Sequence, residues 1–338
     1  MSASDLRTRL DAVPRIRFCQ LPTPLHPLTR LSEHLGGPEL WIKRDDMTGF
    51  GMGGNKSRKL EFLMGAAMVE PATDIITCGA QQSNHARQTA AAAAACGLPC
   101  KLLLTGGPPS GTGNQTLFDW LGAEVEYLGA ISWGDLRRAS EALRDRLTAE
   151  GRKPYLIPVG GSTPLGALGY VNAAIELLEQ GESFDRVYHA SSSLSTQAGM
   201  VAGLKLAGSK MRVTGVLVDL TRPPEPYLAT MANGICELLG LPERFLEGDF
   251  HCDATHIGEG YAIPSEEGIE AIRLLARTEG VFLDPVYSGK AFAGLLADIR
   301  QGKVGRSEKV LFWHTGGSPV LFAQEYAGLA RCHNLGVQ

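Results

Sequence analysis

A chain of 338 residues with 44% hydrophobic residues, 20% charged residues and a formal net charge of −4 is an ordinary globular protein, which excludes disordered and fibrous classes. Its length predicts about two domains. The mild acidity and the lack of like-charge runs argue against nucleic acid or an anionic membrane as a partner. We expect a cytoplasmic protein, because no apolar stretch is long enough to span a bilayer and residues 1–7 contain no apolar secretory core.

The sequence contains seven cysteines, an odd number at irregular spacing. Cys96 and Cys100 flank Gly97 and Pro99, a pattern typical of a helix end followed by a strand, and no second ligand pair completes a zinc site. We therefore expect reduced thiols and no bound metal. The cysteines are Cys19, Cys78, Cys96, Cys100, Cys236, Cys252 and Cys332.

The first predicted elements lead to a lysine. Residues 21–25 should be extended because they contain two prolines, and residues 40–46 predict a strand that ends in a charged turn. After a run of glycines, apolar residues at helical spacing predict a helix that has Asn55 as its cap and ends before Pro71. Lys56 then lies in the first turn, where the positive pole of the helix disfavours an ammonium relative to a neutral amine. Such a lysine is suited to be a nucleophile, with a solvated surface lysine as the alternative.

Strands and helices alternate from residue 74 onward. The expected elements are strands at 74–78, 101–105 and 124–127, and helices at 86–96 and 133–150. This series predicts a small sheet flanked by helices. The glycine-rich loop 159–166 is where we expect the chain to return to a larger unit.

A second series of apolar strands is predicted at 186–190, 212–218 and 309–314. Apolar strands separated by helices indicate parallel sheets that are covered on both faces. We therefore predict an α/β fold in which ligands bind at the carboxyl ends of the strands.

Residues 190–199 are rich in serine and join a predicted strand to a helix. Small residues there expose backbone amides at a helix N-terminus, and the hydroxyls add donors, which together suit a phosphate. A plain helix cap is the alternative. No lysine follows a glycine-rich arc as in a P-loop, which argues against hydrolysis of nucleoside triphosphates.

Residues 79–85 form a second junction between a strand and a helix. Ser83, Asn84 and His85 offer hydroxyl, amide and imidazole groups at a helix N-terminus, where they suit a carboxylate. Capping by Ser83 or Asn84 is the alternative, and a lone histidine does not make a catalytic site.

Two later loops each present a tyrosine, Tyr261 and Tyr287, and Thr315 follows the last predicted strand. A phenol can act as an acid, a base or a hydrogen-bond donor, although packing is its commoner role. The chain has neither the glycine fingerprint of dinucleotide-binding proteins nor the Gly-x-Ser-x-Gly elbow of serine hydrolases. A lysine nucleophile, a phosphate cradle and a carboxylate receptor together fit pyridoxal phosphate acting on an amino acid.

Six separated motifs lie in order along nearly the whole chain, at residues 53–61, 82–88, 195–199, 258–261, 284–287 and 314–317. Together they resemble the 1-aminocyclopropane-1-carboxylate deaminase and D-cysteine desulfhydrase family. The resemblance implies the fold type II architecture of tryptophan synthase β-like enzymes, with two parallel-sheet, three-layer domains and usually a homodimer. It implies a larger domain of residues 1–56 and 162–338 that binds pyridoxal 5'-phosphate, a smaller α/β domain of residues 57–161, and an active site between them.

The resemblance also implies roles for the residues that hold the cofactor. Lys56 would form the Schiff base, and Asn84 would bond the 3-hydroxyl of the pyridoxal ring. Leu194 stands where many relatives have glycine, and its side chain is expected to narrow the phosphate loop. That loop is expected to comprise Ser193, Leu194, Ser195 and Thr196.

The resemblance further implies that Ser83 receives the substrate carboxylate and acts in catalysis. Tyr261 and Tyr287 would flank the substrate as further catalytic residues. The expected substrate-binding residues are Gln82, Ser83, Asn84 and His85.

Two positions separate the branches of the family. The deaminase branch has a glutamate after the tyrosine matched by Tyr287 and a leucine at the position of Thr315, whereas this chain has Ser288 and Thr315, as in the desulfhydrase branch. The resemblance places Ser288 beside the pyridine nitrogen. A neutral hydroxyl there makes a weaker electron sink, which favours loss of a good β leaving group over opening of a cyclopropane.

We therefore expect a lyase that acts on a small amino acid such as D-cysteine and gives pyruvate, ammonia and sulfide. The N-terminal half and residues 81–83 also resemble L-cysteate sulfo-lyases, which release sulfite. The sequence is also compatible with a 1-aminocyclopropane-1-carboxylate deaminase, an amino-acid racemase or an inactive protein that binds pyridoxal phosphate.

Overall fold

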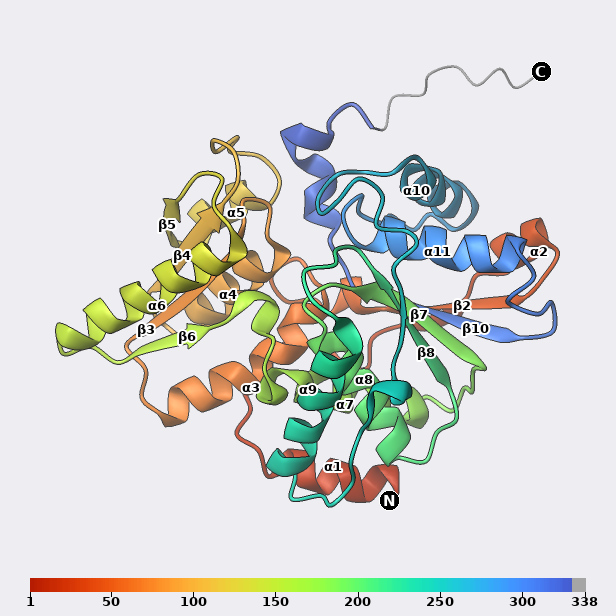
Figure 1. The fold of residues 1–338 in the computed structure, drawn as a ribbon, viewed down its shortest axis with the longest axis horizontal. Helices are drawn as coiled ribbons and strands as arrows, with labels where there is room; N and C mark the ends of the chain where they lie inside the picture. Colours follow the sequence, from red (N-terminus) through yellow and green to blue (C-terminus); the bar gives the residue numbers. More distant parts are fainter. Residues whose placement is uncertain (330–338) are drawn as a thin grey trace.

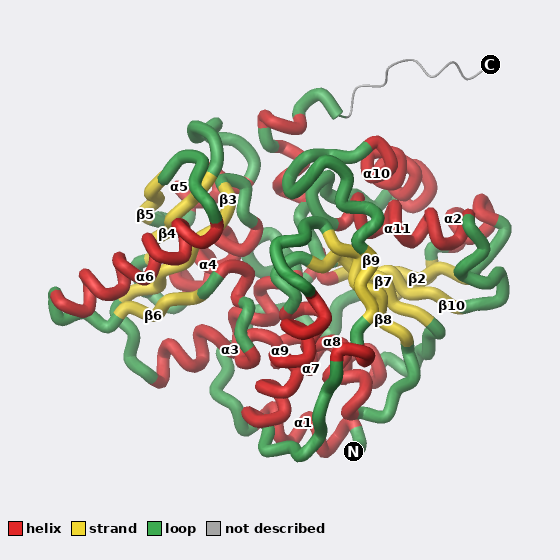
Figure 2. Tube along the Cα trace, viewed as in Figure 1, coloured by secondary structure: helices red, strands yellow, loops and turns green. Residues whose placement is uncertain are grey.

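The computed structural model describes residues 1–329 and contains two β-sheets flanked by helices (Figures 1 and 2). The larger sheet has the strand order β1-β2-β10-β7-β8-β9, and the smaller has the order β5-β4-β3-β6. Neighbouring strands are parallel except that β1 is antiparallel to β2. The predicted α/β fold with parallel sheets is therefore confirmed. The strands are β1 Leu25–Pro27, β2 Glu39–Arg44, β3 Asp74–Ala80, β4 Cys100–Thr105, β5 Glu124–Tyr127, β6 Pro154–Ile157, β7 Arg186–Ser191, β8 Arg212–Leu217, β9 His251–Asp253 and β10 Lys309–His314.

The helices lie on both faces of each sheet. None of those in residues 1–329 is long and apolar enough to cross a bilayer. They are α1 Ala3–Asp11, α2 Thr29–Leu35, α3 Asn55–Val69, α4 Asn84–Ala95, α5 Asn114–Trp120, α6 Trp133–Ala149, α7 Pro164–Glu179, α8 Ser195–Leu206, α9 Pro224–Leu238, α10 Glu266–Glu279 and α11 Ser288–Arg300.

The smaller sheet is the middle layer of three. Helices α3, α4 and α5 pack on one face, and α6 packs on the other. Strand β3 is therefore covered on both sides, which explains why nearly all of its residues are buried rather than every second one. The alanine-rich α4 is fully buried along most of its length, because small side chains let it pack closely between the sheet and its neighbours.

Helices also cover both faces of the larger sheet. Leu311 and Trp313 of β10 face α1, α7, α8 and α9, whereas Val310 and Phe312 face α2, α10 and α11. This alternation follows from the two-residue period of a strand. The strands predicted at 186–190, 212–218 and 309–314 agree with β7, β8 and β10 to within one residue.

Helix α3 joins the two halves of the molecule. Its Leu60 and Met64 pack in the core of the smaller sheet, whereas Phe62 packs in the core of the larger one. Gly169 of α7 lets α3 approach closely, because a Cβ at that position would lie 2.3 Å from the Arg58 carbonyl oxygen. The division of the chain after residues 56 and 161 stays a prediction.

The start of α3 differs from the sequence prediction. Asn55 is the first helical residue rather than the cap, and Gly54 is the N-cap. The reason is the turn before the helix, in which Gly53 and Gly54 have φ values of 70° and 120°. A Cβ on Gly53 would lie 1.8 Å from the Asp46 carbonyl oxygen, so only glycine fits there. The Asn55 side chain is free to donate to Thr196 Oγ1 at 3.0 Å.

The six cysteines among the described residues are free thiols. Cys332 lies outside the described residues.

Candidate active site

A cavity of about 600 Å³ lies between the two sheets. Its walls include residues at the carboxyl ends of β3, β6, β7 and β10, among them Ala80, Pro158, Ser191 and Thr315. Ligand sites of open parallel sheets lie at these ends, where the helix N-termini also point. The cavity is therefore where the topology predicts a ligand.

Lys56 lines this cavity from the first turn of α3, and its Nζ donates to Asn55 Oδ1 at 2.9 Å. The pKa of Lys56 is lowered to about 8, mainly by desolvation; the Asp284 carboxylate opposes this shift, and the Arg87 guanidinium adds to it by a smaller amount. The sequence predicts a lowered pKa from the helix pole, but removal from water is the main cause in the structure. A large fraction of Lys56 is thus neutral near pH 8 and able to act as a nucleophile or base.

The N-terminus of α8 forms one end of the cavity. Ser193, Leu194 and Thr196 line the wall there, and no side chain caps the helix. An uncapped N-terminus presents backbone amides and a positive pole, which suits an anion. Leu194 has a φ of 70°, a left-handed conformation that costs a non-glycine residue about 1–2 kcal/mol. This strain explains why glycine is the expected residue at the position.

Lys59 is a site residue that the sequence analysis does not identify. It is buried one turn after Lys56, and its Nζ donates to Ser195 Oγ at 2.8 Å and to the Gly160 carbonyl at 3.3 Å. Ser195 itself does not line the cavity. Desolvation, with a smaller effect of the Lys56 charge, holds the pKa of Lys59 well below its usual value. A bound anion near Ser195 would stabilise this ammonium. The spacing of three residues from Lys56, which puts both on one helix face, is the signal that points to it.

The junction between β3 and α4 forms the opposite wall. Ser83 Oγ caps α4 by accepting from Ala86 N at 3.0 Å, and Ser83, Asn84 and His85 all line the cavity. Asn84 Oδ1 accepts from Asn114 Nδ2 at 2.9 Å. Ser83 thus caps α4 and also faces the cavity, so a helix cap and a receptor for a carboxylate are compatible interpretations of this junction.

His85 and Gln82, the other two expected substrate-binding residues, differ from Ser83 and Asn84. His85 Nε2 bonds Thr77 Oγ1 at 2.8 Å, and desolvation keeps its pKa well below the usual value, so the imidazole is neutral. Its Nδ1 is buried without a partner among residues 1–329. Gln82 does not line the cavity, because its side chain bonds Asn114 N and the Thr112 carbonyl.

Tyr261 and Tyr287 lie together at the cavity wall, and their hydroxyls form a hydrogen bond. Desolvation raises the pKa of Tyr261 to about 12, and it raises the pKa of Tyr287 well above the usual value. Both phenols are therefore protonated at neutral pH. Trp133 of α6 packs edge-on against Tyr261, with ring centroids 5.8 Å apart. A side chain from a helix that covers the smaller sheet therefore meets the tyrosine pair.

Ser288 lies behind Tyr287 and does not line the cavity, whereas Thr315 does. The Ser288 hydroxyl donates to Asp284 Oδ2 at 2.6 Å and accepts from Asp284 N at 2.8 Å. Its one proton is therefore engaged by a buried carboxylate. Asp284 also accepts from the backbone amides of Val286, Tyr287 and Ser288, which fixes the start of α11.

Further residues complete the cavity without a sequence motif that identifies them. They come from α6, from the loop after β8 and from the first turn of α9, and they include Trp133, Arg137, Asp219, Arg222 and Tyr227. Only the position of that loop, at the carboxyl end of β8, hints at their proximity.

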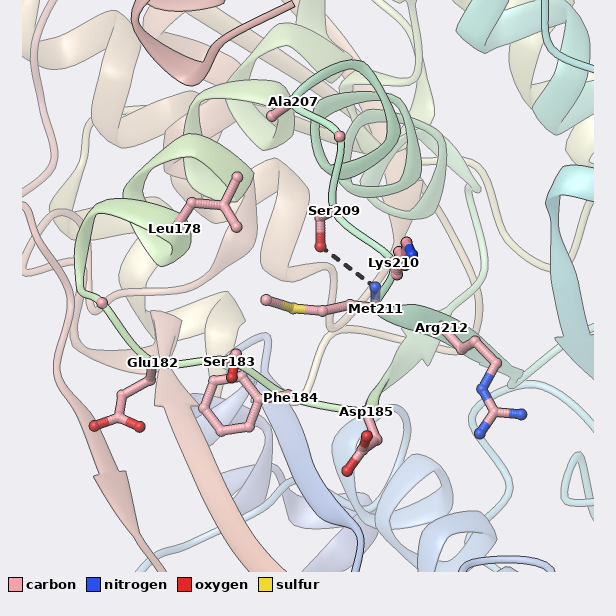
Figure 3. Close-up of a pocket in the computed structure, with 12 residues that line it drawn as sticks. Leu178, Glu182, Ser183, Phe184, Asp185, Ala207, Ser209, Lys210, Met211 and Arg212 are labelled. Atoms are coloured by element: carbon pink, nitrogen blue, oxygen red, sulfur yellow. Dashed lines mark hydrogen bonds between the residues drawn. The ribbon is translucent and has the colours of Figure 1, made fainter.

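A second hollow, of about 580 Å³, lies away from this site (Figure 3). It is lined by the loops around Phe184 and Met211, which precede β7 and β8. It thus lies at the amino ends of these strands, where open parallel sheets do not place their ligand sites.

Comparison with known proteins identifies relatives of the whole chain. A model of the family described as "Pyridoxal-phosphate dependent enzyme" matches residues 16–316. The chain is 43% identical over 326 residues to proteins named D-cysteine desulfhydrase from Salmonella typhimurium (strain LT2) and from Salmonella typhi, covering 93% of this chain and 97% of each relative.

The fold is similar to that of a solved structure titled as an ACC deaminase homologue. The TM-score is 0.89 at 36% sequence identity, and the match covers 96% of this chain and 98% of the other. A pyridoxal 5'-phosphate-dependent aspartate racemase has a TM-score of 0.65 at 17% identity over 94% of this chain and 95% of its own, which shows a shared fold alone. These likenesses confirm the predicted fold type II architecture.

Proposed function

Because the chain belongs to the family of pyridoxal-phosphate dependent enzymes, we propose that it removes the β substituent of D-cysteine or of a similarly small amino acid. The chain is a pyridoxal-phosphate dependent lyase. The products from D-cysteine would be pyruvate, ammonia and sulfide. The observation that carries the substrate assignment is the 43% identity to D-cysteine desulfhydrase over 93% of the chain.

The residues around the cavity fit pyridoxal phosphate. The uncapped N-terminus of α8 and the buried ammonium of Lys59 suit its phosphate, and Lys56 suits its aldehyde. Gly160 belongs to this cradle, since a Cβ there would lie 2.4 Å from Ser193 Oγ. Asn84 is proposed to bond the ring hydroxyl, and Thr315 to lie beside the ring.

The amino-acid substrate would be held at the N-terminus of α4. Ser83 and Asn84 present polar side chains to the cavity there, beside a positive helix pole that suits a carboxylate. The neutral His85 offers hydrogen bonding without adding charge. This arrangement would orient the Cα–H bond of the substrate for attack by a base.

Lys56 is proposed to take the Cα proton on its Nζ, since its lowered pKa leaves a neutral amine. Bound pyridoxal phosphate supplies the electron sink that makes this proton acidic. The hydroxyls of Tyr261 and Tyr287 remain protonated, so either can hold a proton toward the departing β substituent. The contact of Tyr261 with Trp133 would help to exclude water from the reacting atoms.

The proposed function is tested by incubating the purified holoenzyme with a panel of substrates. Pyruvate and sulfide from D-cysteine are expected, with pyruvate also from β-chloroalanine. Pyruvate and sulfite from L-cysteate would instead indicate a sulfo-lyase, and 2-oxobutyrate from 1-aminocyclopropane-1-carboxylate would indicate a deaminase. Inversion without any oxo acid would indicate a racemase, and no turnover of any substrate would contradict a lyase.

A homodimer in the cytoplasm is the proposed state of the protein, without nucleic acid or membrane as a partner. The net charge of −4 supports the absence of polyanionic partners. Large apolar side chains that are at least half exposed, such as Met52, Trp120 and Phe322, support burial against a second copy. Light scattering coupled to gel filtration would give the mass, and a monomer would contradict the dimer.

A further inference from the structure

Lys290 is a buried lysine of α11 to which neither the motifs nor the proposed reaction assigns a role. Its Nζ donates to two backbone carbonyls, that of Ile257 at 2.6 Å and that of Gly260 at 2.8 Å. Both carbonyls belong to the loop between β9 and α10. Two hydrogen bonds from this one side chain thus fix the backbone of the loop.

The backbone of this loop has a conformation that needs contacts with other residues to maintain it. Gly258, Gly260 and Ala262 all have positive φ, at 69°, 148° and 61°, and Ala262 lacks the freedom of glycine in that region. A conformation of this kind persists where the surroundings determine it. Lys290 holds the loop on one side, and the Tyr326 hydroxyl, which donates to the Ala262 carbonyl at 2.8 Å, holds it on the other.

The same loop carries Tyr261, and the segment that begins α11 carries Tyr287. The two tyrosine hydroxyls bond each other at the cavity, and Lys290 lies in α11 three residues after Tyr287, which is the N-cap of that helix. One side chain therefore ties together the two segments that deliver the tyrosine pair. We propose that Lys290 is a positioning residue, an internal cation that fixes Tyr261 against Tyr287 by binding the carbonyls of Ile257 and Gly260.

A lysine suits this task for chemical reasons. An ammonium carries three N–H donors on a compact charge and binds carbonyl oxygens directly. Burial lowers the pKa of Lys290, but the carboxylates of Asp219 and Asp284 oppose the shift. Loss of the side chain would leave two carbonyl oxygens facing a space shaped for a small cation with N–H donors.

The test uses Lys290→Met, which keeps an unbranched apolar stem, and Lys290→Ala, which opens the space. Lys303→Met is the matched control, because Lys303 follows the same helix and is 61% exposed in a surface pair with Asp298. Displacement of a catalytic group by about 1 Å can cost 10²-fold in rate, so we expect both Lys290 variants to lose roughly 10²-fold in kcat with a smaller change in KM. The control should retain wild-type kcat.

Rescue by added amines separates positioning from general damage. Propylammonium supplies the atoms that Lys290→Ala lacks and should restore at least about tenfold of the lost rate, whereas tetramethylammonium has the charge but no N–H donor and should restore none. Equal rescue by both ions, rescue by neither, or wild-type kcat in a folded Lys290 variant would overturn the proposal. Lys290→Met decides the rate test if Lys290→Ala does not fold.

The catalytic part of this inference rests on the proposed function, so a second readout is independent of turnover. Trp133 packs edge-on against Tyr261, and its emission therefore reports where Tyr261 lies. The Trp133 contribution, isolated by comparison with Trp133→Phe, should change in Lys290→Met and not in Lys303→Met. An unchanged Trp133 emission in Lys290→Met would overturn the proposal that Lys290 fixes Tyr261, even if the wild-type protein turned over no substrate. A changed emission alongside an inactive wild type would contradict the proposed function alone.

Discussion

Lys59 Nζ donates a hydrogen bond to Ser195 Oγ at 2.8 Å, which joins a buried lysine of α3 to the first residue of α8. The helix N-terminus and a lysine side chain are both favourable for an anion, and here they lie together directly behind the cavity wall. The proposed site for the phosphate of the cofactor therefore does not depend on any single hydroxyl.

The first prediction concerns Lys59→Met. Charge-assisted hydrogen bonds contribute about 1.5–3 kcal/mol, so the variant should bind pyridoxal phosphate roughly 10- to 100-fold more weakly. Titration of the apoprotein, followed by absorbance of the bound cofactor, measures this affinity. The affinity of Lys59→Arg, which keeps the charge, should lie between those of the wild type and Lys59→Met. Wild-type affinity in Lys59→Met would contradict the role.

The second prediction concerns the pH dependence of Lys56. An ordinary lysine is protonated up to a pKa near 10.5, whereas desolvation lowers the pKa of Lys56 to about 8. The neutral amine is the reactive form, so the rate at which apoprotein takes up pyridoxal phosphate covalently should rise with pH and level off above about 8. Stopped-flow absorbance measures the rate. Lys56→Ala should show no covalent uptake, and a rate that still rises steeply from pH 9 to 10 would contradict the lowered pKa.

The sequence predicts most of what depends on local pattern. Apolar runs place the central strands, and β10 is predicted with its observed limits because it is buried on both faces. The helices α1, α2, α5, α7, α10 and α11 are not predicted, and neither are the strands β1, β6 and β9. Their formation depends on packing against distant residues, as for Leu6 and Leu10 of α1, which are buried in the core of the larger sheet.

The residues of the candidate active site likewise divide into those that the sequence predicts and those that it does not. Ten of the residues expected from the motifs line the cavity, and all the motifs except residues 258–261 lie next to a carboxyl end of a strand or a helix N-terminus. Gln82, Ser195 and Ser288 stand behind the wall, since a motif fixes the position of the backbone and not the direction of a side chain. Lys59 and Lys290 are missed because their partners are distant backbone carbonyls and a hydroxyl, a pairing that no motif marks. Only the spacing of Lys59 from Lys56 hints at its place beside the site.

The third prediction concerns the buried ion cluster at the base of α3. Arg58 donates to both carboxylate oxygens of Asp45 and of Glu176, and Lys43 Nζ donates to Glu176 Oε1. Removal of one partner of a buried pair leaves an uncompensated charge, so Arg58→Met should lower the free energy of unfolding by about 3–5 kcal/mol. Denaturant titration measures it.

The control for this cluster is Arg300→Met. Arg300 pairs with Glu270 at the surface, where the two side chains are 52% and 59% exposed. Such pairs contribute about 0–1 kcal/mol. A loss in Arg58→Met no larger than the loss in Arg300→Met would show that the buried cluster does not stabilise the start of α3.

The fourth prediction concerns Ser288→Glu, the change that would install the residue of the deaminase branch. Ser288 Oγ lies 2.6 Å from Asp284 Oδ2, and both residues are fully buried. A second carboxylate there cannot ionise without strong repulsion. We therefore expect Ser288→Glu to lose about 3 kcal/mol or more in the free energy of unfolding and to release no 2-oxobutyrate from 1-aminocyclopropane-1-carboxylate.

A second substitution identifies repulsion as the cause of that loss. Asp284→Asn removes the charge but keeps an Oδ1 that can accept from the amides of Val286 and Tyr287, as Asp284 Oδ1 does at 2.8 Å. Alone it should destabilise the protein, because it weakens the start of α11. Combined with Ser288→Glu it should recover part of the stability, so that the double variant is more stable than the sum of the single losses predicts. Additive losses would mean that the glutamate is rejected by its size rather than by the charge of Asp284.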